Sequence, residues 1–216
     1  RGLSKNPLTA DTALATYGVL CGMVMPVIMF PTALLYSFTG LLRLSLSSKK
    51  AELEKQYAFM DQVRAITKQQ KKVYVQTFGC QQNEADSERL MGMAVEMGYE
   101  PTDTPEEASL IMVNTCAIRE HAEKRALSLV GQYKHVKAKN PELIIVICGC
   151  MVVQEHRLRD IKMRYPYVDI LFGPSLIYKL PEHLWNRRGG SRRVFDPDDC
   201  EYRVAEGLPV RRESSY

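Results

Sequence analysis

Three of the six cysteines stand just past short apolar runs that are typical of buried β-strands. The runs, each with the cysteine that follows it, are KVYVQTF (72–78) with Cys80, LIMVNT (110–115) with Cys116, and LIIVICG (143–149) with Cys150. Because the carboxyl ends of parallel strands share one edge of a sheet, three thiols far apart in sequence would meet there. Three thiolates without a fourth partner suit a [4Fe–4S] cluster that keeps one iron open to a small ligand.

The residues around these cysteines fit that chemistry. Gly79 and Gly149 directly precede two of them, and glycine allows the close backbone approach and unusual φ that a bulky cluster needs. Helices expected after Cys80 and Cys116 would aim their positive N-termini at the same edge. Such helix ends help to hold an anionic cluster and lower thiol pKa values.

The other three cysteines are interpreted differently. Cys148 lies inside the third apolar run, where a free cysteine acts as a small buried hydrophobe. Cys21 falls in an apolar N-terminal stretch and is expected to be inert. Cys200 sits in a polar region, where no chemistry is assigned to it.

Zinc is the main rival to an iron–sulfur cluster. Three thiolates with His121 or His156 could form a tetrahedral site. The chain has no C-x-x-C pair, however, and a lone helical histidine is more often a surface or packing residue. No G-x-G-x-x-G or P-loop motif follows the first strand, which argues against nucleotide binding of those kinds.

Alternating strand-like and helix-like segments predict the fold. An amphipathic helix over 51–71 leads into a doubly wound, parallel α/β domain over 72–187, with four to five strands and helices on both faces. Residues 188–216 are expected to form a linker with one short strand. The segments are strands at 72–78, 110–115, 143–149 and 168–173, helices at 84–97 (N-cap Asn83), 118–139, 152–165 and 174–185, and a capping box from Thr104 to Glu107.

The first fifty residues have a different character. No charged residue occurs from Thr12 to Leu42, a length that could cross a bilayer, although Pro26 and Pro31 would kink such a helix. The basic residues after this stretch favour a cytoplasmic exit. Membrane contact through 12–42, a buried soluble hairpin and a misjoined fragment all remain open as interpretations of residues 1–50.

Charge and cysteine usage narrow the class of protein. The formal net charge of +4 comes wholly from residues 1–50, since residues 51–216 carry 24 basic and 24 acidic groups. A neutral body predicts no general attraction for phosphates, so an RNA partner needs other support. Six unevenly spaced cysteines do not resemble a secreted disulfide scaffold, which favours a reduced, cytosolic setting.

Four segments together resemble the N-terminal domain of tRNA methylthiotransferases of the MiaB type, over about 51–216. They are TFGCQQNEADSERL (77–90), NTCAIREHAEKR (114–125), GCMVVQE (149–155) and VDILFGP (168–174). Ribosomal-protein methylthiotransferases share the three-cysteine plan, but their motifs typically read C-P-K-N and N-T-C-G-F. Residues 81–83 (QQN) and 117–120 (AIRE) favour the tRNA branch.

The resemblance implies a role for each part. Cys80, Cys116 and Cys150 would hold the auxiliary [4Fe–4S] cluster, whose open iron carries the sulfur for C2 of N6-isopentenyladenosine 37 in tRNA. S-adenosylmethionine and a second cluster would be handled by a following radical domain with a C-x-x-x-C-x-x-C motif, which is absent here. The chain alone is therefore expected to bind a cluster without completing catalysis. The family is cytoplasmic, a monomer is expected, and the sulfur donor is not identified.

Residues 13–37 are weakly similar to a segment of a sporulation-type polysaccharide or lipid flippase. Methylthiotransferases carry no such segment, so a fusion and an artefact are both open. Two further hypotheses stay beside the methylthiotransferase reading. One is a membrane-tethered module that holds zinc, and the other is an interaction scaffold with buried thiols.

Overall fold

The computed structural model describes residues 47–67, 71–116, 120–190, 193–196 and 207–212. The chain divides into two compact units, Arg1–Lys50 and Ala51–Tyr216, and the account below concerns the second. The predicted apolar stretch 12–42, with Cys21 and the flippase-like residues, lies outside the described part, as does Cys200. Among the described helices, none combines the length and apolar character needed to span a bilayer.

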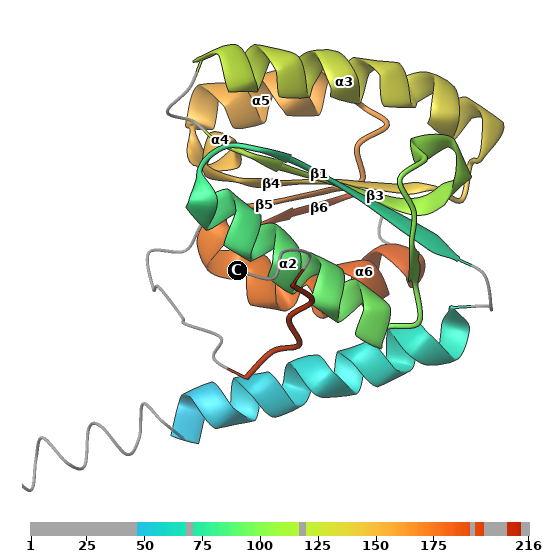
Figure 1. The fold of residues 1–216 in the computed structure, drawn as a ribbon, viewed down its shortest axis with the longest axis vertical. Helices are drawn as coiled ribbons and strands as arrows, with labels where there is room; N and C mark the ends of the chain where they lie inside the picture. The colour runs from blue at the N-terminus through green and yellow to red at the C-terminus, as the bar shows by residue number, and fades with distance from the viewer. Residues whose placement is uncertain (1–46, 68–70, 117–119, 191–192, 197–206, 213–216) are drawn as a thin grey trace, which may run out of the picture. The chain divides into compact units, whose positions relative to one another are not determined.

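A six-stranded parallel sheet forms the centre of the second unit (Figure 1). Every strand pair in the described residues is parallel, which confirms the predicted sheet type. The sheet has one more strand than expected at its edge. In spatial order the strands are β2 (Glu100–Pro101), β1 (Lys72–Phe78), β3 (Ala108–Thr115), β4 (Ile144–Gly149), β5 (Ile170–Phe172) and β6 (Val194–Asp196).

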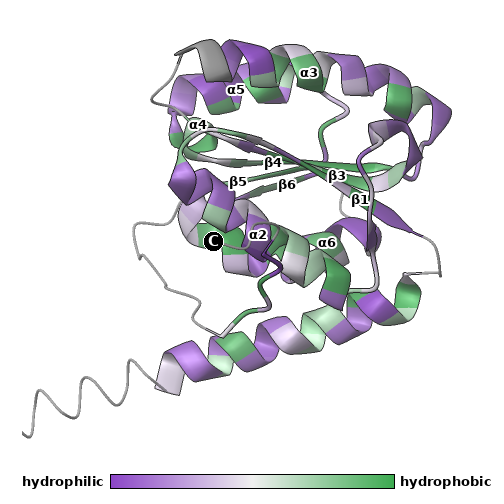
Figure 2. Ribbon diagram, in the orientation of Figure 1, coloured by the Kyte–Doolittle hydropathy of each residue, from purple (hydrophilic) through white to green (hydrophobic). Residues whose placement is uncertain are grey.

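Helices cover both faces of this sheet, as predicted (Figure 1). On one face lie α2 (Gln81–Glu96) and α6 (Leu180–Arg188), together with residues 51–66 of the N-terminal helix. On the other lie α3 (Glu120–Lys139) and α5 (Glu155–Arg164). The apolar sides of the helices turn inward and their polar sides outward (Figure 2).

Period-two alternation along β3 explains why two cores form. Leu110 and Met112 belong to the core under α2 and α6, whereas Ile111 and Val113 belong to the core under α3 and α5. All four side chains are fully buried. A strand covered on both faces needs apolar residues at successive positions, and this explains the continuous apolar runs in the sequence.

Three local predictions were wrong. Helix α2 begins at Gln81 with Cys80 as its N-cap, so Asn83 lies inside the first turn and is not the cap. The helix expected at 152–165 is two helices, α4 (Cys150–Val153) and α5, because Gln154 is extended between them. Thr104 precedes a short 3₁₀ turn, η1 (Pro105–Glu107), and its side chain makes no capping bond.

The predicted last helix at 174–185 is also divided. A 3₁₀ segment, η2 (Pro174–Lys179), leads directly into α6, which continues to Arg188. Three of its residues, Leu176, Leu180 and Leu184, are buried in the core beneath α2. The segment therefore serves as the second covering element of that face.

Part of the expected linker packs against the domain. Leu208 is buried, and the backbone N–H of Arg211 donates to the carbonyl oxygen of Glu88 on α2 over 3.1 Å. The hydroxyl of Tyr57 donates to the carbonyl oxygen of Gly207 over 2.7 Å. Residues 207–212 thus lie against α2 and the N-terminal helix.

His183 on α6 makes the fold sensitive to acid. Its ring lies 5.3 Å from that of Phe172, and its Nε2 lies 3.6 Å from the Asp196 carboxylate. Burial lowers the pKa of His183 from 6.5 to about 4, with Lys179 acting in the same direction and Asp196 and Glu182 opposing it.

We therefore expect stability to fall as the pH drops from 6.5 towards 4. In that window the unfolded chain binds a proton at His183 that the folded chain does not, which costs on the order of 3 kcal/mol. Urea unfolding of the chain and of His183→Leu, at pH 7 and at pH 4.5, measures this loss. An identical pH dependence in the two proteins would contradict the assignment.

Candidate functional site

The three predicted cysteines lie at the same edge of the sheet. Phe78, Thr115 and Gly149 face one another in register across β1, β3 and β4. Cys80 follows this row by two residues, and Cys116 and Cys150 each follow it by one. The structure therefore places all three cysteines just beyond the carboxyl ends of three adjacent strands.

The strand order adds a reason to expect a ligand at this edge. The chain passes from β1 to β2 on one side and then returns to β3 on the other side of β1. The order therefore reverses between β1 and β3, and Cys80 and Cys116 follow the two strands that flank the reversal. In open α/β sheets this switch point is where ligands bind.

The three thiols differ in exposure, and two of them influence the third. Cys116 is buried, Cys80 and Cys150 are partly exposed, and none of these three forms a disulfide. Burial raises the pKa of the Cys150 thiol, and charges at Cys116 and Cys80 raise it further. Since such an electrostatic effect requires proximity, the cysteines lie near one another as well as on one edge.

Asn83 joins two of the cysteine junctions through its side chain. Its Oδ1 accepts a hydrogen bond from the backbone N–H of Cys80 over 3.3 Å. Its Nδ2 donates to Asn114 Oδ1 over 3.0 Å and to the carbonyl oxygen of Thr115 over 3.3 Å. One buried amide therefore ties the start of α2, which holds Cys80, to the end of β3, which precedes Cys116.

Asn114 completes this buried network from the β3 side. Its Nδ2 donates to the carbonyl oxygen of Asn83 over 2.8 Å and to Ser87 Oγ over 3.1 Å. Thr77 Oγ1 on β1 also donates to Ser87 Oγ, over 2.7 Å. Buried polar groups are costly unless they are paired, so this paired network fixes how α2 sits on β1 and β3. The sequence analysis missed Asn114 and Ser87, whose signal is a polar residue at a core position.

Gly149 determines how β4 reaches Cys150. Its φ is +99° and its ψ is −173°, a combination that is essentially restricted to glycine. A Cβ at this position would lie 2.2 Å from the carbonyl oxygen of Thr115 and 2.6 Å from Asn114 Oδ1. The backbone of β4 thus passes directly against the end of β3, as expected of a glycine that permits close approach.

An acidic residue lies close to the thiols. Asp86 on α2 is buried, and its Oδ1 accepts hydrogen bonds from Arg89 over 2.9 Å and from Gln82 over 3.1 Å. Burial raises the pKa of Asp86 despite these partners. Its charge in turn raises the pKa of Cys148 and Cys150.

Cys148 is the buried hydrophobe that the sequence analysis expected. It is fully buried in the core beneath α2 and α6, and burial raises the pKa of its thiol far above the ordinary value. Cys148 and Cys150 are two residues apart, yet one is in the core and the other is at the sheet edge. Only the three edge cysteines remain as candidate ligands among the described cysteines.

The side chains that the structure describes include no group of three His, Cys, Asp or Glu set closely enough to share one metal ion. The three thiols with His156 therefore do not form a preorganised zinc site. His156 is instead exposed on α5, and the side chain of His121 lies outside the described part.

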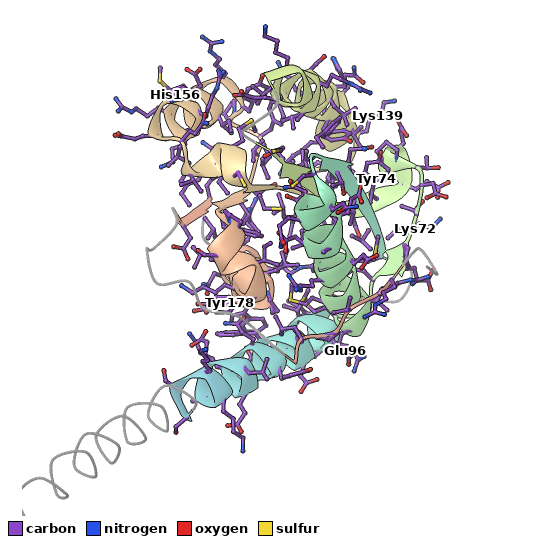
Figure 3. All side chains as sticks on the ribbon, turned by 60° about the vertical axis from the view of Figure 1, so that its left-hand side comes forward. Lys72, Tyr74, Glu96, Lys139, His156 and Tyr178 are labelled. Atoms are coloured by element: carbon purple, nitrogen blue, oxygen red, sulfur yellow. The ribbon has the colours of Figure 1, made fainter. Side chains whose placement is uncertain are left out.

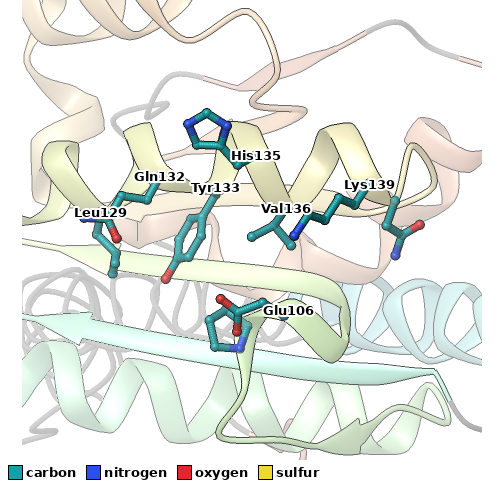
Figure 4. Close-up of a pocket in the computed structure, with 9 residues that line it drawn as sticks. Glu106, Leu129, Gln132, Tyr133, His135, Val136 and Lys139 are labelled. Atoms are coloured by element: carbon teal, nitrogen blue, oxygen red, sulfur yellow. The ribbon is translucent and has the colours of Figure 1, made fainter.

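The pockets found in the described part are not at the cysteine edge. One lies between α3 and η1, with Glu106, Leu129 and Tyr133 among its walls (Figure 4). Another is lined by residues near the amino end of β4, including Ile144, Lys71 and Arg187. Neither of these two pockets contains any of the three cysteines.

The domain that carries these cysteines has a known family. Residues 72–173, which run from β1 to the end of β5, match the family described as uncharacterized protein family UPF0004. This part of the chain therefore belongs to that family, as a doubly wound α/β domain with three thiols at its carboxyl edge.

Relatives with assigned names point to one enzyme. The chain is 45% identical over 142 residues to tRNA-2-methylthio-N(6)-dimethylallyladenosine synthase of Clostridium botulinum (strain Alaska E43 / Type E3), covering 66% of this chain and 31% of the relative. It is 43% identical over 165 residues to the enzyme of the same name from Thermoanaerobacter sp. (strain X514), covering 76% and 35%. The chain thus spans about a third of the length of these relatives. The flippase resemblance of residues 13–37 has no support from these comparisons.

Proposed function

We propose that this chain is the cluster-binding, N-terminal part of a tRNA methylthiotransferase, with Cys80, Cys116 and Cys150 as the ligands of an auxiliary [4Fe–4S] cluster. The observation that supports this most directly is the common edge. Three thiols follow three adjacent strands, two of them at the switch point, and Cys150 lies near enough to the other two to feel their charge. The names of the relatives support the same assignment.

The donor set fits a cluster better than it fits a single zinc ion. Thiolates that share one zinc lie about 3.8 Å apart, given a Zn–S distance of about 2.3 Å. In a [4Fe–4S] cube each cysteine binds a different iron, so its ligands stand further apart. Three thiols that follow three separate strands, with no C-x-x-C pair among them, suit the second arrangement better. When bound through three cysteines, the cluster would supply an iron open to a sulfur ligand.

The chain's own residues would give this cluster its setting. Asn83 would hold the Cys80 and Cys116 junctions together, and Gly149 would let β4 bring Cys150 close to β3. Partial exposure of Cys80 and Cys150 would leave one side of the site accessible. These roles are binding and positioning, and no residue here is assigned to catalysis.

The complete reaction is proposed by analogy with the relatives. It would add a methylthio group to C2 of N6-isopentenyladenosine 37 in tRNA, in the cytoplasm. S-adenosylmethionine and a second cluster would be needed, and the C-x-x-x-C-x-x-C motif expected to bind that cluster does not occur in these 216 residues. We therefore propose that this chain alone, expected to be a monomer, binds a cluster but does not turn over.

Anaerobic reconstitution with iron and sulfide tests the assignment. We expect a brown protein with about four irons and four sulfides per chain, as a [4Fe–4S] cluster requires. Single replacement of Cys80, Cys116 or Cys150 by serine should remove most of the iron and the visible absorption. Cys148→Ala is the matched control, because that thiol is fully buried in the core, and it should retain the cluster.

Two outcomes would contradict the proposal. The first is iron content that stays unchanged in all three serine variants. The second is zinc recovered in place of iron from the reconstituted chain, in an amount that depends on the same cysteines.

A further inference from the structure

We propose that the outer face of α3 is a contact surface for the sugar–phosphate backbone of RNA. This inference rests on the proposed function, because it names the surface through which a tRNA substrate would approach the domain. The surface is defined by Arg125 and Lys139, which are both exposed, and is here called the α3 cation face.

The fold separates charges that cancel in the sequence. Helix α3 has five basic and two acidic residues, a net charge of +3. Helix α2 has one basic and four acidic residues, a net charge of −3. Because α2 and α3 lie on opposite faces of the sheet (Figure 1), a body with no net charge has one basic and one acidic side.

Several cations elsewhere in the described part have acidic partners. Lys55 pairs with Glu182 and Arg64 with Glu96, each at 3.0 Å. Lys137, although it belongs to α3, points inward and pairs with the buried carboxylate of Asp169. The two opposite charges of such a pair largely cancel at a distance, so the pair attracts a distant polyanion only weakly.

The α3 cation face is different. Within the described residues no acidic side chain lies within ion-pair distance of Arg125 or Lys139. Arg125 and Lys139 are fourteen residues apart, which is about 21 Å along a helix and leaves them on neighbouring lines of its surface. Lys139 lies on α3 and His156 on α5, the two helices of this face (Figure 3).

The neighbouring pocket helps to define the partner. It lies beneath α3 and contains the carboxylate of Glu106 beside Tyr133 and Val136 (Figure 4). Lys139 is among the residues that line this pocket, and its exposed side chain also belongs to the α3 cation face. A carboxylate would repel phosphate, so the backbone contact is assigned to the exposed cations and not to the interior of the pocket. Unpaired cations spread along a helix fit a polyanion with regularly spaced charges, which is what RNA presents.

A salt series with a fluorescein-labelled tRNA tests the surface. The full chain, Arg125→Gln/Lys139→Gln and the matched control Arg211→Gln/Arg212→Gln would be titrated by fluorescence anisotropy. The control removes the same charge from exposed arginines next to α2. We expect the α3 variant to bind roughly tenfold more weakly at 0.1 M salt, with a slope of log K against log[salt] shallower by about 1.4 to 1.8. The control should change affinity by less than about twofold.

Iron content of the same samples separates this inference from the proposed function. An α3 variant that assembles the cluster but binds tRNA like the unaltered chain would overturn the inference alone. Equal weakening in the control, no tRNA binding by the unaltered chain, or displacement of tRNA by phosphatidylglycerol vesicles would also overturn it. Failure of the unaltered chain to assemble a cluster would count against the proposed function instead.

Discussion

Replacing Gly149 by alanine is expected to destabilise the domain by at least about 3 kcal/mol and to prevent cluster assembly. A non-glycine residue at a φ of +99° and ψ of −173° is strained by about 1–3 kcal/mol on its own. The added Cβ would also meet the carbonyl oxygen of Thr115 at 2.2 Å, which is backbone and cannot rotate away. Relief requires β4 to move away from β3, which would displace Cys150 from Cys116.

Gly131→Ala on α3 is the control for this prediction. A Cβ at Gly131 would meet nothing within 4 Å, and the residue lies inside a helix. Alanine should therefore stabilise the chain there by up to about 1 kcal/mol. Thermal unfolding and iron content after reconstitution measure both variants. Equal melting temperatures for Gly149→Ala and the unaltered chain would show that the strand ends are not held as described.

Asn83→Leu is expected to have the second large effect. Leucine has a similar volume but removes three hydrogen bonds, which are those with the part-buried Cys80 N–H, the buried Asn114 amide oxygen and the Thr115 carbonyl oxygen. With about 1–3 kcal/mol for each unpaired group and some relaxation, we expect a loss of about 3 kcal/mol. The Cys80 and Cys116 junctions would no longer be tied together, so the iron retained after gel filtration should fall as well.

Two further variants show whether Asn83 acts through its hydrogen bonds. Asn83→Asp keeps an acceptor for the Cys80 N–H but loses the donor to Asn114 and Thr115, so it should be damaging too. Gln81→Ala removes an exposed side chain from the same turn of α2 and should leave both stability and iron content unchanged. Retention of iron and stability in Asn83→Leu would refute a positioning role for this amide.

Much of the fold could be predicted because its strands are buried on both faces. A strand such as β4 reads as an unbroken apolar run, and its limits in the sequence and in the structure agree within one residue. β2 was missed because two exposed residues contain no hydrophobic pattern. The break between α4 and α5 was missed because it falls at a glutamine, Gln154, and not at a glycine or proline that would signal it.

The common edge of the three thiols was predicted, whereas the amides that join the strand ends were missed. Cys80, Cys116 and Cys150 could be inferred because parallel strands must end at one edge, which requires no knowledge of side-chain contacts. Asn83 was misread because asparagine before a helical pattern is the usual N-cap signal, whereas here cysteine occupies that position. Its bonds to Asn114 and Thr115 join positions more than thirty residues apart, and no local pattern encodes such bonds.

The neutral charge balance of residues 51–216 is correct as a sum, but it does not describe how the charges are distributed over the surface. Charge affects a partner through its distribution over the surface, which depends on which helix covers which face. The alternation of segments predicted helices on both faces, yet the sequence analysis did not compare their charges. The opposite signs of α2 and α3 became apparent only with that comparison.

Because Cys148 and Cys150 are only two residues apart, the register of strand β4 determines where each of these thiols lies. Inserting or deleting one residue within β4 would turn its side chains to the opposite faces of the sheet. The Cys148 sulfur, which now lies in the core, would move relative to the sheet edge. The Cys150 sulfur, which now lies at that edge, would move away from Cys80 and Cys116. Hydrogen-bonded pairing with β3 and β5 therefore decides which of these two thiols lies at the sheet edge and which lies in the core.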